Sequence, residues 1–398
     1  MIPLEFDLLE PLGRLITRPW ADAVTGLQID SRRIAEGDLF VAVGGGADFV
    51  EHALARGAAA TLVPDDAHAA LATIAGTVRD RSNARVVAIT GSTGKTSTKD
   101  ILYAICAPQA KTIANEGNYN NELGVPLTLA RLETDTEICI TELGMRGLGQ
   151  IAYLASFSKP DIGVITNVGP VHLELVETIE NVAKAKSELL AALPSGGIAV
   201  IPDEPLLDPH LDRADITIDR VDLEAPLPFA TSYTARHQVA NTHFAVAAAR
   251  HLGIALPNGE LHVEFSKLRE EERELPGGGL LLNDCYNANP VSMRAALEHL
   301  TERAAGRRRV AVLGEMAELG AGAPAYHEEI GALVRELGIE HVIAVGGLAR
   351  AYGGEWVADA DGASERLRAE LRPGDVVLVK GSRAVGLEVV AENLERER

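Results

Sequence analysis

The chain has 398 residues, of which 46% are hydrophobic and only 4% aromatic, so it can form two or three globular domains with largely aliphatic cores. Its formal net charge is −20, and since nucleic-acid binding depends on clustered Lys and Arg, we expect no nucleic-acid partner. No basic and then apolar segment follows Met1, and no apolar run could span a bilayer, which predicts a cytoplasmic protein without membrane insertion.

Residues 1–84 are expected to form a first domain. Residues 38–43 (DLFVAV) predict a strand, and residues 50–60 predict an alanine-rich helix. The motif Asp30-Ser31-Arg32 brings a carboxylate, a hydroxyl and a guanidinium together. Such a set could hold a diphosphate or a sugar, although a turn with a solvated Arg fits the pattern equally well.

A phosphate-binding loop is predicted at the start of a second unit, in the stretch RVVAITGSTGKTSTKD. Residues 86–89 are apolar, as in a parallel strand covered on both faces. The Gly residues that follow let backbone N–H groups approach a ligand, while a Lys and a Thr stand at a helix start. An ordinary capped turn is the alternative, but a Lys opposes the helix dipole there. We predict a nucleotide site formed by Gly91, Ser92, Thr93, Gly94, Lys95, Thr96 and Ser97, with Thr96 binding Mg²⁺.

Residues 85–266 alternate apolar strands with helical stretches, which indicates a doubly wound parallel sheet. The further strands are predicted at residues 137–141, 162–166 and 197–201. Ligands of such sheets bind beyond the carboxyl ends of the strands. Glu142, Asn167 and His172 follow these strands, so we expect them at one shared edge.

Two further segments of this unit are candidates for binding. Four asparagines, Asn115, Asn118, Asn120 and Asn121, predict either a long polar connection or a loop that recognises a sugar nucleotide. Residues 177–193 predict a helix with Lys184 and Lys186 near its middle. By pattern these lysines belong to a solvated face. A neutral lysine at a metal site can instead react with CO₂ to give a carbamate, an anionic oxygen ligand.

Residues 267–398 predict a third domain that again alternates strands with helices. Its strands are expected at residues 280–282, 310–313, 342–345 and 376–379. The last strand is followed by Lys380, Ser382 and Arg383, which predict either a small anion site or a solvated loop. The fold class is therefore α/β with three domains, of which the central one is a P-loop-type parallel sheet domain and the C-terminal one is Rossmann-like.

The motifs together resemble those of the Mur ligases, the ATP-dependent amide-forming enzymes of peptidoglycan synthesis. The resemblance rests on TGSTGKTS (90–97), GNYNNELGVPLTL (117–129), TELGMRGLGQI (141–151), TNVGPVHLE (166–174), AKAKSE (183–188), DCYNANPVSM (284–293), VLGEMAELG (312–320) and KGSRAVGLE (380–388). YNANP, GEMAELG and KGSRA are typical of the members that add D-alanyl-D-alanine.

The resemblance implies roles for individual residues. Lys95 and the loop amides would hold the ATP phosphates, Thr96 and Glu142 would bind a first Mg²⁺, and His172 with a carbamylated Lys186 would bind a second. Residues expected at the nucleotide and the incoming dipeptide are Arg269, Asp284, Tyr286, Asn287 and Asn289. Residues expected at the remaining substrate groups are Asp30, Ser31, Arg32, Asn120, Asn121, Lys380, Ser382 and Arg383.

The implied activity joins UDP-N-acetylmuramoyl-tripeptide to D-alanyl-D-alanine through an acyl phosphate. Residues 1–84 would bind the UDP-sugar peptide, residues 85–266 would bind ATP, and residues 267–398 would close over ATP and bind the dipeptide. We expect a monomer. Two alternatives stay open at this point: a related Mur-type or folylpolyglutamate-type ligase for another carboxylate, and a P-loop NTPase that hydrolyses ATP without ligation.

Overall fold

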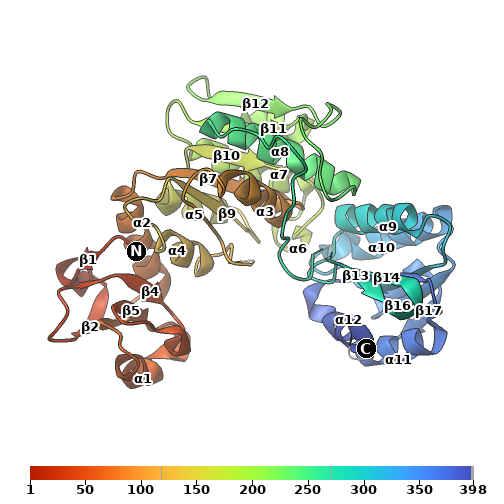
Figure 1. Cartoon of the computed structure of the whole chain (residues 1–398), viewed down its shortest axis with the longest axis horizontal. Coiled ribbons are helices and arrows are strands. Elements are labelled where there is room, and N and C mark those ends of the chain that lie inside the picture. Colours follow the sequence, from red (N-terminus) through yellow and green to blue (C-terminus); the bar gives the residue numbers. More distant parts are fainter. Residues whose placement is uncertain (118, 270, 396–398) are drawn as a thin grey trace.

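Three α/β lobes follow one another along the chain in the computed structural model (Figure 1). The structure describes residues 1–117, 119–269 and 271–395. Asn118, one of the four clustered asparagines, lies outside the described residues. Each of the three main sheets lies within one lobe, so the lobes form separate α/β units.

The first lobe contains a four-stranded sheet in the order β2-β6-β5-β4, with β2 antiparallel to β6 and the other pairs parallel. A second sheet pairs β1 with β3. The elements are β1 (Leu4–Glu5), β2 (Gly13–Thr17), β3 (Ala23–Val24), β4 (Gly26–Gln28), β5 (Asp38–Val41), α1 (Val50–Ala55) and β6 (Ala60–Pro64). The predicted helix over residues 50–60 is wrong in its second half. Gly57 adopts φ +103°, which ends the helical turn, and the buried residues 58–60 lead into β6 instead.

The central lobe is an all-parallel sheet in the order β12-β11-β10-β7-β9-β8. Its strands are β7 (Arg85–Thr90), β8 (Thr112–Ala114), β9 (Ile138–Glu142), β10 (Ile162–Ile165), β11 (Ile198–Pro202) and β12 (Thr217–Val221). The four strands predicted here are confirmed to within one residue at each end. The strands β8 and β12 lie at the two edges of the sheet and were not predicted.

Helices cover both faces of this sheet. They are α2 (Ala67–Asp80), α3 (Lys95–Cys106), α4 (Gly124–Leu129), α5 (Gln150–Ser158), α7 (Ile179–Ala191) and α8 (Arg236–Leu252). The four-residue helix α6 (Leu173–Val176) contacts α7. Val86 and Ala88 face the core shared with α2, α4, α5 and α7, whereas Val87 and Ile89 face the core shared with α3 and α8. This alternation explains why β7 reads as a continuous apolar run. Although α2 lies within the first 84 residues, it packs against α4 and α5.

The C-terminal lobe has a six-stranded sheet in the order β13-β14-β18-β15-β16-β17, parallel except for the pair β13 and β14. Its elements are β13 (Glu271–Leu275), β14 (Gly279–Asn283), α9 (Pro290–Ala304), β15 (Arg309–Gly314), α10 (Ala323–Glu336), β16 (His341–Val345), β17 (Glu355–Val357), α11 (Ala360–Glu370), β18 (Val376–Lys380) and α12 (Glu388–Glu395). The four predicted strands are confirmed. The charged sequence of β13 suits an edge strand, which periodicity of apolar residues alone does not detect.

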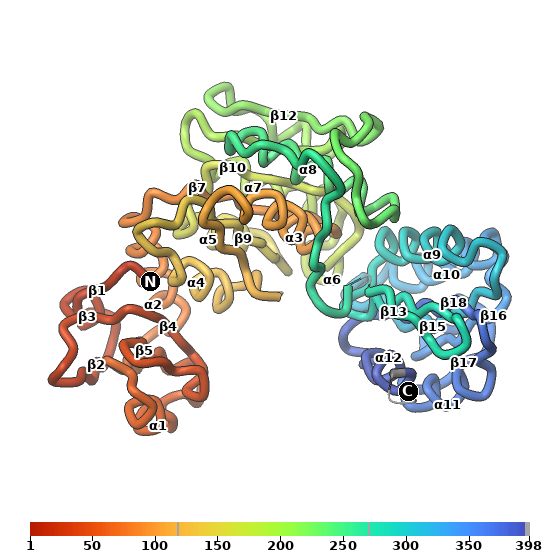
Figure 2. The backbone as a smooth tube through the Cα atoms, viewed as in Figure 1, coloured from red at the N-terminus to blue at the C-terminus, as the bar shows by residue number. Residues whose placement is uncertain are grey.

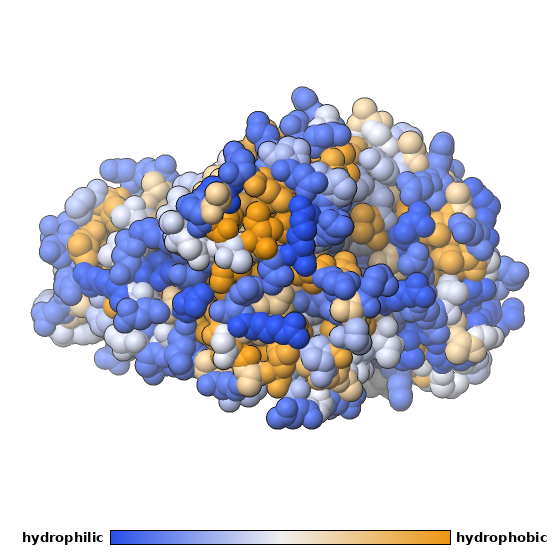
Figure 3. Space-filling model, turned by 90° about the horizontal axis from the view of Figure 1, so that it is seen from above, coloured by the Kyte–Doolittle hydropathy of each residue, from blue (hydrophilic) through white to orange (hydrophobic). Residues whose placement is uncertain are grey.

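The chain passes from the central to the C-terminal lobe along a connection that follows α8 (Figure 2). Seen from above, hydrophilic side chains cover much of the surface, and apolar patches lie between them (Figure 3). Within the described residues, no helix combines the length and the apolar character that crossing a membrane requires.

The packing of α3 can be tested with two adjacent residues. Leu102 is fully buried against the central sheet, whereas Tyr103 on the same helix is 42% exposed. Leu102→Ala should lower the free energy of unfolding of the central lobe by about 2–5 kcal/mol, because it leaves a cavity under the helix. Tyr103→Ala should change it by only about 0.5 kcal/mol. Hydrogen exchange of the β7 amides in increasing urea measures both values, and equal effects would contradict this packing.

Candidate active site

The site lies where three neighbouring parallel strands end. β7 pairs with β9 on one side and with β10 on the other, so the segments that follow these strands meet at one edge of the sheet. β7 leads into the phosphate loop, β9 ends at Glu142, and β10 leads into Thr166 and Asn167. The sequence predicted this meeting from the rule that ligands of a doubly wound sheet bind beyond the carboxyl ends of its strands.

The phosphate loop requires glycine at two positions because of its close neighbours. Gly91 has φ +154°, and a Cβ atom there would lie 1.9 Å from Thr166 Oγ1. Gly94 has φ +77°, and a Cβ atom there would lie 2.2 Å from Asn241 Oδ1 of α8. α3 starts directly afterwards at Lys95. The loop is therefore pressed between the end of β10 and helix α8.

Side chains after β10 hold the loop in shape. Asn167 Oδ1 accepts hydrogen bonds from the backbone N–H groups of Ser92 at 3.0 Å and Thr93 at 2.9 Å. Thr166 Oγ1 donates to the Thr93 carbonyl at 2.6 Å. An amide oxygen at the N–H groups of this loop shows that they can bind an electronegative atom. Thr166 and Asn167 were recognised only as strand-end residues in the sequence, and their role in supporting the loop was missed.

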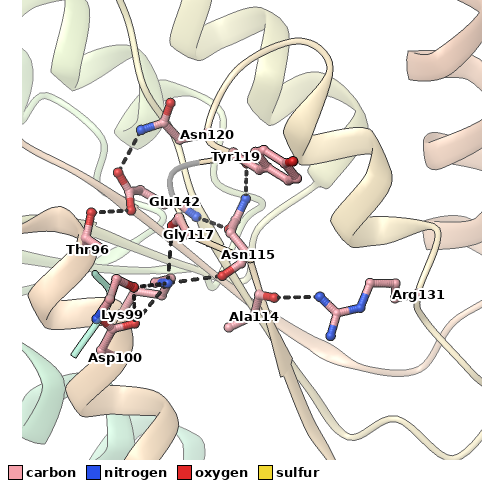
Figure 4. A network of polar contacts seen from close by, with 11 residues as sticks. Thr96, Lys99, Asp100, Ala114, Asn115, Gly117, Tyr119, Asn120, Arg131 and Glu142 are labelled. Carbon is pink, nitrogen blue, oxygen red and sulfur yellow. Dashed lines mark hydrogen bonds and ion pairs between the residues drawn. The ribbon is translucent and has the colours of Figure 1, made fainter. Parts of the chain in front are cut away.

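Glu142 and Thr96 form the acidic part of the site. Thr96 Oγ1 donates to Glu142 Oε2 at 2.8 Å, and Asn120 Nδ2 donates to Glu142 Oε1 at 2.7 Å (Figure 4). Both Thr96 and Glu142 are buried. Asn115 Oδ1 also accepts from the backbone N–H of Glu142. The asparagine segment therefore fixes the carboxylate, which is a contact that the sequence did not predict.

Lys99, one turn further along α3, anchors this same segment. It is buried, donates to the Asn115 carbonyl at 3.0 Å, and pairs with Asp100 at 2.9 Å (Figure 4). Asp100 in turn accepts from the backbone N–H of Ser266 at 2.8 Å, in the connection to the C-terminal lobe. Lys99 was missed because a Lys in a helix usually predicts a solvated position.

Three basic side chains gather beside the loop. Burial lowers the pKa of Lys95 to about 8, while Glu142 raises it and Arg269 lowers it. Burial also lowers the pKa of Lys186 well below its ordinary value, and the charge of Lys95 adds to this effect. For His172, burial again is the largest cause of a lowered pKa, Glu318 opposes it, and Lys95 and Lys186 lower it further. Lys95, Lys186 and His172 therefore share one electrostatic environment.

Lys186 and Lys184 occupy opposite environments on α7. Lys184 is exposed, whereas Lys186 is 1% exposed and lies on the buried face of the helix. No described residue forms a hydrogen bond or an ion pair with Lys186. A buried amine with a lowered pKa and without a counter-charge is favoured in its neutral form, which is the form that reacts with CO₂.

The C-terminal lobe contributes to the site from the other side. A cavity of about 650 Å³ lies between the two lobes, and its lining includes Thr96, Gly117, Arg269, Tyr286 and Arg383. The Arg269 guanidinium lies 4.2 Å from the centre of the Tyr286 ring, a cation–π contact. The cavity thus joins the phosphate loop to three residues that the sequence predicted for the nucleotide and the substrates.

Other predicted residues of the C-terminal lobe form contacts within that lobe. Lys380 is buried and ion-paired with Asp284, and it donates to the Asn287 carbonyl at 3.1 Å. Asn289 caps α9 through a reciprocal pair of bonds with Ser292. Ser382 is buried and accepts from the Ala317 N–H at 2.8 Å. Lys380 is thus paired with a carboxylate inside the lobe, whereas the sequence predicted that it could bind an anion. Asn287 and Arg383 are exposed.

The first-lobe residues make local contacts in the structure. Asp30 caps a short helix and binds the Arg32 guanidinium at 2.8 Å, and Ser31 Oγ lies 2.9 Å from His52 Nδ1. The adjacent Arg33, which the sequence did not single out, pairs with Glu116 at 3.2 Å. The motif therefore lies next to the asparagine segment. In that segment, Asn121 Oδ1 accepts from the Gly124 N–H at 3.0 Å at the start of α4.

The side-chain atoms of the site can be compared with the ligands that a metal ion requires. Among residues 1–117, 119–269 and 271–395 there is no group of three or more His, Cys, Asp or Glu side chains placed to hold a metal. Thr96 Oγ1 and Glu142 Oε2 are two hard oxygens at a phosphate loop. Mg²⁺ takes few protein ligands and completes its shell with water and phosphate oxygens, so this pair fits it.

Comparisons with known proteins agree with this geometry. The family model of the Mur ligase middle domain matches residues 89–223, and that of the Mur ligase, glutamate ligase domain matches residues 269–383. The UDP-N-acetylmuramoyl-tripeptide--D-alanyl-D-alanine ligase of Synechocystis sp. is 35% identical over 428 residues, covering 94% of this chain and 92% of that protein.

Solved structures give the same result. The structure of MurF from Acinetobacter baumannii superposes with a TM-score of 0.85 at 26% identity and covers 99% of both chains. MurF ligase from Thermotoga maritima in complex with ADP superposes with a TM-score of 0.80 at 27% identity, covering 94% of this chain and 99% of that one. With a phosphate loop, a buried Glu at the adjacent strand end and these matches, the chain belongs to the Mur ligase family.

Proposed function

We propose that the chain is an ATP-dependent ligase that joins the terminal carboxyl group of UDP-N-acetylmuramoyl-tripeptide to the amino group of D-alanyl-D-alanine. The observation that carries the proposal is the meeting of the phosphate loop, the Thr96–Glu142 pair and the His172 and Lys186 side chains at one sheet edge. Relatives that match almost the whole chain are ligases with these substrates in their names.

The charges of the site support ATP as the energy source. Lys95 and Arg269 bring two cationic groups together beside the amine of Lys186, and burial lowers the pKa of both lysines. A bound polyphosphate would offset this repulsion and favour the charged form of Lys95. We assign Lys95 and the backbone N–H groups of the loop to the β- and γ-phosphates, and Arg269 with Tyr286 to the nucleoside end of the cavity.

Two magnesium sites are part of the proposal. Thr96 and Glu142 would hold the first ion, and His172 with a carbamylated Lys186 would hold the second. Lys186 supports this assignment because it is buried and has no partner among the described residues, so a carbamate there would supply the missing anionic oxygens. Mg²⁺ bound at these sites would offset the negative charge that accumulates on the phosphate oxygens.

The reaction class follows from the chemistry of carboxylates. A carboxylate is a poor acyl donor because its leaving group would be oxide. Transfer of the γ-phosphoryl group of ATP to one carboxylate oxygen gives an acyl phosphate and ADP, and attack by the neutral amine then forms the amide and releases phosphate. Lys95 and the loop hold the phosphates in line with the carboxylate, and the facing lobe limits the access of water.

We assign substrates to the lobes in the order of the chain. Residues 1–84, with Asp30, Ser31 and Arg32, would bind the UDP-sugar peptide beside Asn120 and Asn121. Residues 85–266 would bind ATP. Residues 267–398 would cover ATP and receive the dipeptide near Asp284, Asn287 and Arg383. Because the reaction consumes ATP, we place it in the cytoplasm, and we propose a monomer as the active form.

A product assay tests the proposed reaction. The protein is incubated with ATP, Mg²⁺, D-alanyl-D-alanine and UDP-N-acetylmuramoyl-tripeptides that differ at the third residue, and the products are weighed by mass spectrometry. We expect a condensed product with one ADP and one phosphate per amide bond, formed only when both substrates are present. Phosphate release from ATP alone would indicate an NTPase, and no condensation with any tripeptide would indicate a ligase for another carboxylate.

The role of Lys186 can be tested by chemical rescue. Lys186→Ala should lower turnover by at least about 100-fold, equivalent to about 3 kcal/mol of lost charge stabilisation, and small carboxylates such as formate or acetate should partly restore it. Lys184→Ala is the matched control, and it should behave as wild type because its side chain is exposed. Lys95→Ala should stay inactive with or without carboxylates. Full activity of Lys186→Ala without additives would exclude the carbamate.

A further inference from the structure

One side chain of the C-terminal lobe reaches directly into the strand-end site of the central lobe. Glu318 Oε2 is hydrogen-bonded to His172 Nδ1, and Glu318 Oε1 lies 3.5 Å from the guanidinium of Arg146. Arg146 follows β9 and His172 follows β10, so the two carboxylate oxygens contact two different strand ends. The side chain of Glu318 is 34% exposed.

The backbone on both sides of this contact is held in an uncommon conformation. His172 has φ +54° and Glu318 has φ +62°, both in the left-handed region that non-glycine residues rarely adopt. The Glu174 N–H donates to the Glu318 carbonyl at 3.3 Å, and a Cβ atom on Gly320 would lie 3.2 Å from Glu174. Such strain costs about 1–2 kcal/mol per residue, and it persists only where the surrounding contacts maintain it.

The hydrogen bond determines which imidazole nitrogen carries the proton. An ionised carboxylate can only accept, so His172 Nδ1 must be the donor in its bond to Glu318. In the neutral ring, Nε2 then carries the lone pair, and it is the nitrogen able to bind a metal ion. Carboxylate acceptors of this kind orient metal-binding histidines in many proteins.

We propose that Glu318 is a positioning residue by which the C-terminal lobe completes the second magnesium site: it fixes the His172 tautomer that leaves Nε2 free for the ion. This inference rests on the proposed role of His172 as a ligand. It adds that docking of the C-terminal lobe and binding of that ion are coupled, because the ligand is correctly oriented only while Glu318 is in place.

Two readouts test the proposal in the full-length protein without measuring turnover. The first is the ¹⁵N NMR signal of the His172 imidazole, assigned with the His172→Ala variant, in the absence of metal. The second is binding of Mn²⁺ in the presence of ADP, measured by electron paramagnetic resonance. In wild type we expect the Nδ1–H tautomer and two bound Mn²⁺ ions.

Glu318→Ala should give a mixture of His172 tautomers and lower the affinity for the second Mn²⁺ ion by about 10- to 100-fold. Glu318→Gln should retain much of both properties, because its amide oxygen still accepts from Nδ1–H. Glu328→Ala is the matched control: Glu328 is exposed on α10 of the same lobe, and its loss changes the net charge equally. This control should match wild type in both measurements.

The outcomes distinguish a failure of the role of Glu318 from a failure of the role of His172 as a metal ligand. An unchanged tautomer or an unchanged Mn²⁺ affinity in Glu318→Ala overturns the role of Glu318. If His172→Ala loses the second ion while Glu318→Ala keeps it, only the present inference fails. If His172→Ala still binds both ions, the metal assignment in the proposed function itself is wrong.

Discussion

The parallel pairing of β7 with β9 and β10 is the constraint on which the site depends. Parallel neighbours end at the same edge of a sheet, so the phosphate loop, Glu142 and the segment with His172 are brought together by topology. Hydrogen bonds from neighbouring side chains then fix the positions of these groups. Glu142 is held by Thr96 and Asn120, and the loop is held by Asn167. Each of these partners comes from a different strand end or from the segment between two strands.

This constraint also concentrates positive charge. Lys186 is buried beside the partly buried Lys95, and the lowered pKa values of the two lysines reflect the free-energy cost of holding both as ammonium groups at this place. A polyphosphate beside Lys95 and a carbamate on Lys186 would both lower this cost, so the site is arranged for anionic groups. The contact between Glu318 and His172 extends the arrangement across the cavity into the C-terminal lobe.

The sequence predicted those features that depend on local pattern. Strand-loop-helix periodicity identified β7 and the phosphate loop, and the position of Glu142 and His172 after further parallel strands predicted that they lie beside it. The preference for Lys186 over Lys184 came from a family resemblance, and the structure adds that only Lys186 is buried. Long-range pairing could not be read from pattern. Lys380 pairs with Asp284 and Ser382 bonds to the Ala317 N–H, and both partners lie far away along the chain. Asn289 has a local partner instead, because it caps α9 through Ser292.

The fate of one carboxylate oxygen tests the central claim that this sheet edge phosphorylates a carboxyl group. The tripeptide substrate, labelled with ¹⁸O in its terminal carboxylate, is ligated with unlabelled ATP, and the released phosphate is analysed by mass spectrometry. If phosphoryl transfer to the carboxylate precedes amide formation, each phosphate carries one ¹⁸O atom. Phosphate without ¹⁸O would show that ATP is cleaved by water, and it would contradict the account.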